Sequence, residues 1–389
     1  MKKITLLLLF TLCLSVCFAK NYTTGKNVPC SEYQVRLSDK LYIGSSESFE
    51  CLATIAHLAG FEEYNQTYNG IDYSAWDEYF SKYLNNKDVQ AAIKYFKKLR
   101  NIGFSYDAIA NASSYMTPDC QSLKYDTKLI KKHMQKRCGN PEKLVSYVSK
   151  FYEATNFDSF YISQLENYKS LCKVYIDNSN TLNTAISEIE NYFNKEIDTV
   201  FICVSEIIGY NNYGNSFFDG KSTHFNPHYC RSNFDINLFI HELSHPFSSE
   251  IVEKSMKNKN LTKAIDNRLT KNLENKLSQD AYPGVFGYLN EMLNRANTIV
   301  ILEQFLDEIQ ITEALLYDFS YGFVDIFTVY EIFKEYKNGN YTNQLDFSPY
   351  FEQKYIEKLK NPNDNYLFSF LIHHFLFFPN NPLCWLGYC

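Results

Sequence analysis

The residues best able to do chemistry lie in the stretch His241-Glu242-Leu243-Ser244-His245. On a helix, two histidines four positions apart lie on one face, so both imidazoles can reach a single metal ion. Glu242 is offset around the helix and can point at a water bound to the same ion, as a general base and not as a ligand. This H-E-x-x-H spacing predicts the helix of a zinc-dependent hydrolase. The alternative is a helix with two surface or core histidines.

A catalytic zinc site takes three protein ligands and leaves a fourth position for water. Two histidines from the motif leave one ligand to find. We predict Glu291, which lies in a long helical stretch at about 283–305, as the third ligand of one Zn²⁺ ion. His224 and His228 are alternative extra ligands, but both lie in a polar, loop-like stretch.

Pro246 directly follows the second histidine. Proline lacks an N–H and clashes with the carbonyl four residues earlier, and it disfavours the helical region for the residue before it. We therefore expect the metal helix to kink or end near this point. Glu250 and Glu253 are closer in sequence than Glu291, but a break at Pro246 would make their return to the metal awkward.

The elements that must position these residues follow from hydrophobic periodicity. Helical spacing predicts helices at residues 47–60, 73–84, 87–102, 105–115, 141–154, 157–170 and 181–195. A β-branched and aromatic run predicts a strand at 199–204. Residues 209–234, rich in Gly, Asn and Ser, offer edge-strand positions that could capture an extended substrate by strand addition. His57, on the first helix, is expected to be packed or at the surface.

These elements predict an α+β fold that is mostly helical, with a zincin-like catalytic region that contains a small mixed sheet and the H-E-x-x-H helix. We expect a helical N-terminal region at 20–195, the catalytic region at 196–310 and a helical C-terminal region at 311–389. Residues 1–19 are expected to be a signal peptide.

The first residues read as an export signal. Lys2-Lys3 precede an apolar run that ends near Ala19, so we expect secretion or an extracytoplasmic location, with cleavage after Ala19. A lipid anchor at Cys17 is an alternative. No later apolar run reaches the ~20 residues of a membrane-spanning helix.

Net charge bears on the class of binding partner, and the cysteine content bears on disulfides. The chain has 38 basic and 44 acidic residues, and loss of Lys2 and Lys3 would leave a net charge of −8. This balance does not suit a nucleic acid. Cysteines of an exported chain are candidates for disulfides. An odd number of cysteines follows residue 19, so one of them must stay free or pair with another molecule. The cysteines that follow residue 19 are Cys30, Cys51, Cys120, Cys138, Cys172, Cys203, Cys230, Cys384 and Cys389.

The motif followed by Asn290-Glu291 resembles the gluzincin peptidases, in which a Glu of an Asn-Glu pair on a second helix is the third ligand. Asn294-Arg295 stands where that family has Ser-Asp, so the usual partner of a ligand histidine is replaced. The resemblance implies a Tyr or His that stabilises the oxyanion. We assign this role to Tyr321, with Tyr317 as the second candidate.

A broader likeness joins the chain to a family of exported bacterial proteins known as a domain of unknown function. It spans most of residues 45–350. The matching pieces are 58–64, Tyr106-Asp107-Ala108, the H-E-x-x-H motif, Asn290-Glu291, Arg295-Ala296 and Tyr321-Gly322-Phe323. The likeness implies a peptidase without a named substrate.

The sequence thus predicts an exported zinc metallopeptidase that acts on peptide or protein substrates. Zinc held by His241, His245 and Glu291 would activate a water and polarise the scissile carbonyl. Glu242 would accept the water's proton and pass it to the leaving amine. The alternative is an exported binding or adhesion protein that keeps a zincin-like scaffold without turnover.

Overall fold

The structure is a computed structural model that describes residues 34–66, 72–124, 128, 138–208, 214, 216–218, 223–225, 228–229, 234–269 and 284–360. The chain forms two compact units. The first comprises Met1–Ile186 and Glu196–Leu243, and the second comprises Ser187–Lys195 and Ser244–Cys389. The three regions predicted from the sequence stay a prediction. The two compact units do not test these domain boundaries, because a compact unit need not be able to fold alone.

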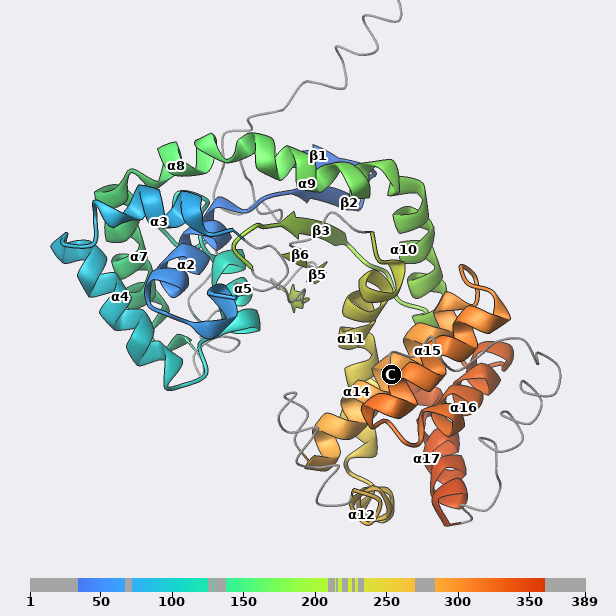
Figure 1. The fold of residues 1–389 in the computed structure, drawn as a ribbon. Helices are drawn as coiled ribbons and strands as arrows, with labels where there is room; N and C mark the ends of the chain where they lie inside the picture. Colours follow the sequence, from blue (N-terminus) through green and yellow to red (C-terminus); the bar gives the residue numbers. More distant parts are fainter. Residues whose placement is uncertain are drawn as a thin grey trace, which may run out of the picture. The chain divides into compact units, whose positions relative to one another are not determined.

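The described chain is mostly helical and has one mixed sheet, which confirms the α+β class. In the first unit, α2 (Glu47–Leu58) is buried among the helices around it (Figure 1). The Ser46 side chain caps its first turn, and Gly60 follows it with a positive φ of 78°. The neighbouring helices are η1 (Glu62–Tyr64), α3 (Ser74–Ser81), α4 (Lys87–Arg100), α5 (Tyr106–Tyr115), α7 (Pro141–Thr155), α8 (Phe157–Ser163) and α9 (Leu165–Asp177).

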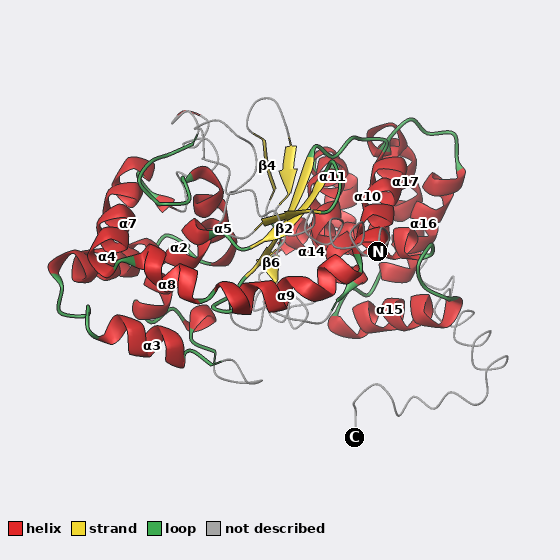
Figure 2. Cartoon of the chain, turned by 90° about the horizontal axis from the view of Figure 1, so that it is seen from above, coloured by secondary structure: helices red, strands yellow, loops and turns green. Residues whose placement is uncertain are grey.

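The sheet lies in the first unit, and β3 (Thr199–Val204) is its central strand. The strand order is β1 (Gln34–Arg36), β2 (Leu41–Gly44), β3, β5 (Thr223–Phe225), β4 (Ser216–Phe218). β2, β5 and β6 (His228–Tyr229) pair with β3 in parallel, whereas β1 and β4 pair antiparallel with their neighbours. β5 and β6 keep one register along β3, and α9 packs across β2 and β3 (Figure 2).

The second unit is helical in its described part. α14 (Gly284–Leu302) is buried over most of its length and packs against α15 (Glu308–Tyr321) and α16 (Ile326–Asn338). α17 (Gln344–Lys360) packs against α12 (Lys259–Asp266) and α16. Two helices contribute residues to both units, namely α10 (Ser179–Phe193) and α11 (Ile236–Ser255).

Of the two expectations for the metal helix, that it ends near His245 is wrong, and that it kinks there stays a prediction. α11 is one continuous helix that runs through Pro246 to Ser255. A proline inside a helix costs about 3 kcal/mol, but the residues after it are well packed. Phe247 and Ile251 are buried, and the Phe247 ring stacks on Phe193 with centroids 5.0 Å apart. Burial of these side chains offsets the lost backbone hydrogen bond.

Other sequence-based predictions hold with local differences. The strand at 199–204 and the helix at 283–305 are confirmed as β3 and α14. The predicted helix at 157–170 is two helices, α8 and α9, divided at Gln164. β1 and β2 were not predicted, because strands of three and four residues carry too little periodicity. None of the helices in the described ranges has the length and apolar character that a membrane crossing requires.

Cysteines in the described ranges are buried. Burial raises the pKa of the Cys120 thiol, and its contact with the Cys51 thiol raises that pKa further. The cysteines with buried thiols in these ranges are Cys51, Cys120, Cys138, Cys172 and Cys203. The other cysteines and the predicted signal peptide lie outside the described residues, so disulfide pairing and export stay predictions.

Candidate metal centre

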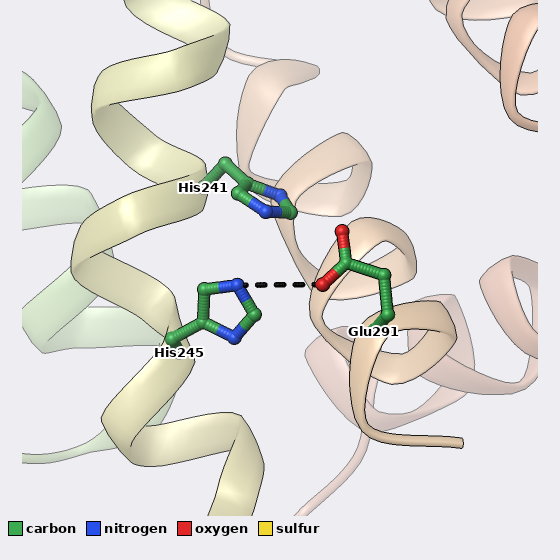
Figure 3. Close-up of side chains that lie close together, drawn as sticks. All are labelled: His241, His245 and Glu291. Carbon is green, nitrogen blue, oxygen red and sulfur yellow. Dashed lines mark ion pairs between the residues drawn. The ribbon is translucent and has the colours of Figure 1, made fainter. Parts of the chain in front are cut away.

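Helix α11 presents the two motif histidines on one face. His241 and His245 are one turn apart, and Figure 3 shows both rings directed toward α14. The side chains can do this because α11 continues past the motif and is fixed there by polar contacts to α14. The Ser249 hydroxyl lies 2.8 Å from the His245 carbonyl oxygen and 3.0 Å from the Asn290 Oδ1.

Glu291 of α14 completes a three-residue cluster. The ligand atoms of His241, His245 and Glu291 lie within 4.8 Å of one another. The His245 Nε2 and the Glu291 Oε2 are 3.5 Å apart. Two ligands bonded at roughly 2.0–2.1 Å to one tetrahedral zinc ion would be roughly 3.4 Å apart. The separation and the donor set of two imidazoles and one carboxylate therefore fit a zinc ion.

The two sides of this cluster differ in exposure. The His245 side chain is 29% exposed, whereas the Glu291 side chain is 3% exposed. A catalytic zinc site needs one side open to water and substrate and the others closed. The arrangement therefore suits a site that is entered from the histidine side.

Residues next to Glu291 on α14 explain its position. Asn290 contacts Ser249 on α11, so the Asn-Glu pair joins the two helices that carry the cluster. Arg295, one turn later, donates to Glu291. Arg295 is thus a partner of the Glu291 carboxylate.

Glu242, the predicted general base, is closely approached by Gly214. A Cβ added at residue 214 would lie 2.3 Å from the Glu242 Oε2 and 2.8 Å from the Glu242 Cβ. Only glycine allows the backbone to pass so close to the carboxylate. Residue 214 lies two positions before β4, the strand at one end of the strand order. That an edge strand beside the metal helix captures a substrate stays a prediction.

The two predicted oxyanion residues lie on α15. The Tyr321 ring stacks on Phe323 and faces the Arg295 guanidinium, whose carbon is 5.4 Å from the ring centroid. Tyr317 is 58% exposed and contacts Tyr321. Tyr321 thus lies beside the partner of Glu291. Its role at the oxyanion stays a prediction.

The other histidines and carboxylates considered as ligands either have other partners or are described only by their backbone. His57 is buried, with Nδ1 2.9 Å from the Tyr64 carbonyl oxygen and Nε2 3.1 Å from an Asp77 carboxylate oxygen, as expected for a packed histidine. Glu250 forms an ion pair with Lys195. For His224 in β5 and His228 in β6 the structure describes the backbone alone.

Two of the residues that shape the cluster were not identified as functional from the sequence. Gly214 stood in a stretch rich in Gly, Asn and Ser, where any single glycine has the same signal. Arg295 departs from the gluzincin pattern and belongs to the likeness with the exported bacterial family, but neither observation predicts a role for it at the metal. No family model, curated protein or solved structure matches the chain.

Proposed function

We propose that this protein is an exported zinc metallopeptidase that hydrolyses peptide bonds. The observation that carries the proposal is the convergence of His241, His245 and Glu291 on one point, although His241 and Glu291 are 50 positions apart in the sequence. The first two residues belong to an H-E-x-x-H motif that also supplies Glu242. A bare pair of surface histidines would not require a buried carboxylate directed at the same point.

The chemistry follows from the residue types. A zinc ion bound at this cluster supplies the Lewis acidity that activates a water and polarises the scissile carbonyl. Glu242 accepts the proton of the attacking water and donates it to the leaving amine. Glycine at residue 214 leaves room for the Glu242 side chain, because a Cβ there would collide with it.

The strand arrangement supports a peptide as the substrate. β4 is at one end of the strand order, and the chain that enters it contacts Glu242. An extended peptide paired with such an edge strand would pass the general base with its backbone fixed by the ladder. A peptide or protein substrate therefore suits the site.

The test is the substitution Glu242→Gln, which keeps the shape of the side chain but cannot accept a proton. Wild type, Glu242→Gln and chelator-treated wild type are incubated with a peptide library, and the products are identified by mass spectrometry. We expect cleavage to fall by roughly 10²–10⁴-fold in the variant and to be lost with the chelator. Glu253→Gln, on the exposed side of the same helix, is the matched control and should keep full activity.

Two results would contradict the proposal. Equal cleavage by wild type and Glu242→Gln would exclude the general-base role. Zinc binding without cleavage by any form would favour the alternative of a binding or adhesion protein on the same scaffold.

A further inference from the structure

The two oxygens of the Glu291 carboxylate have different neighbours. Oε2 faces His245, with 3.5 Å between Oε2 and the imidazole Nε2. Oε1 accepts from Arg295, whose Nε and second terminal nitrogen both lie 2.8 Å from it. One oxygen is therefore directed to the metal cluster and the other is held by a guanidinium.

The Arg295 side chain is itself fixed from several sides. Its remaining terminal nitrogen forms an ion pair with Asp318 of α15, which is buried. The rings of Tyr321 and Phe323 face the guanidinium carbon at 5.4 Å and 4.8 Å. Only 18% of the Arg295 side chain is exposed. Such a side chain has little freedom to move, so the oxygen it holds has little freedom as well.

We propose that Arg295, held by Asp318, is a positioning residue that makes Glu291 a one-oxygen metal ligand. This inference rests on the proposed function, because it concerns the same metal cluster. Partners outside the ligand sphere fix ligand orientation, and they usually act on the histidines. In this chain such a partner acts on the carboxylate.

The guanidinium also changes the electrostatics of the site. A carboxylate that shares its charge with Arg295 donates less charge to the ion, so the ion remains a stronger Lewis acid. Lysine could not replace arginine fully, because an ammonium is a point charge and cannot present two parallel N–H groups to one oxygen while a third binds Asp318.

The experiment measures Co²⁺ binding to the metal-free full chain, with visible absorption as the readout, so that no activity is needed. We expect Arg295→Gln to weaken Co²⁺ binding by roughly 10–100-fold, because the lost orientation of Glu291 outweighs the charge that its carboxylate regains. The absorption bands should also change, because the freed carboxylate can bind with both oxygens. Arg295→Lys keeps the charge and should lie between wild type and Arg295→Gln. Arg268→Gln is the matched control, since Arg268 pairs with the buried Asp325 in the same unit.

The outcomes separate this inference from the proposed function. If wild type binds no Co²⁺, the metal centre itself is wrong and the positioning role falls with it. If wild type binds Co²⁺ and Arg295→Gln has the same affinity and spectrum, only the positioning role is wrong. An equal loss in Arg268→Gln would also overturn it, because general destabilisation would then explain the effect. Should Arg295→Gln fail to fold, an unchanged Arg295→Lys spectrum and affinity would decide against the proposal.

Discussion

Glu291 and Glu50 are both buried carboxyl groups, 2% and 1% exposed, but their surroundings are opposite in character. Glu291 has a guanidinium on one oxygen and an imidazole near the other. Glu50, on α2 in the first unit, faces the hydroxyl groups of Ser205 and Tyr168. Neither Glu50 oxygen has a well-formed hydrogen bond within the described residues.

The pKa of Glu50 reflects this difference. Burial raises its pKa to about 8, the hydroxyls of Ser205 and Tyr168 lower it slightly, and the nearby Glu206 carboxylate raises it. Glu50 is therefore mostly protonated in the folded protein at neutral pH. A guanidinium, by contrast, favours the charged form of the carboxylate that it contacts. Equal burial thus accompanies a mostly protonated acid in one unit and a carboxylate paired with a guanidinium in the other.

The largest expected effect comes from removing the charged carboxylate. Glu291→Ala should weaken zinc binding by more than roughly 100-fold, since the loss of a ligand exceeds the loss of an outer partner. Zinc retained after dialysis against a chelator measures this, with Glu250→Ala of α11 as the control. Full zinc retention by Glu291→Ala would show that the Glu291 carboxylate is not a metal ligand.

A smaller but still large effect concerns the protonated carboxyl. Glu50 has a pKa of about 8 when folded and 4.5 as its ordinary value, so the folded state holds the proton more tightly. Its contribution to the free energy of unfolding is complete below pH 4.5 and is lost as pH rises toward 8, by a few kcal/mol in order of magnitude. Denaturant unfolding across this range should show the loss in wild type. Glu50→Gln, which cannot ionise, should show a flatter profile, and identical profiles would refute the assignment.

The smallest effect tests the neighbouring hydroxyl. Tyr168→Phe removes a group that lowers the pKa of Glu50, so the ionised form becomes still less favourable. We expect the stability of the variant at alkaline pH to fall relative to wild type by about 1 kcal/mol, the usual contribution of one hydrogen-bonding group. The same denaturant series measures it. A variant more stable than wild type at alkaline pH would show that the hydroxyl does not support the carboxylate.

The chemistry of α11 could be predicted from the sequence because it depends on local geometry. The spacing of His241 and His245 places both on one face of any helix, and the structure keeps them there. The apolar, β-branched run at 199–204 likewise predicts β3. The prediction of Glu291 required only one further helix that carries a carboxylate. α14 could be recognised as that helix because it is a long, mostly apolar segment.

The rest depended on contacts between residues distant in sequence. The passage of α11 through Pro246 follows from the burial of Phe247 and Ile251, which no local rule contains. The approach of Gly214 to Glu242 and the pairing of Asp318 with Arg295 require packing that brings separate segments together. Periodicity and spacing are properties of neighbouring residues, so the sequence alone determined which groups can do chemistry. Only the tertiary structure decided which oxygen of Glu291 faces the histidines, because that choice is made by a side chain fixed through another helix.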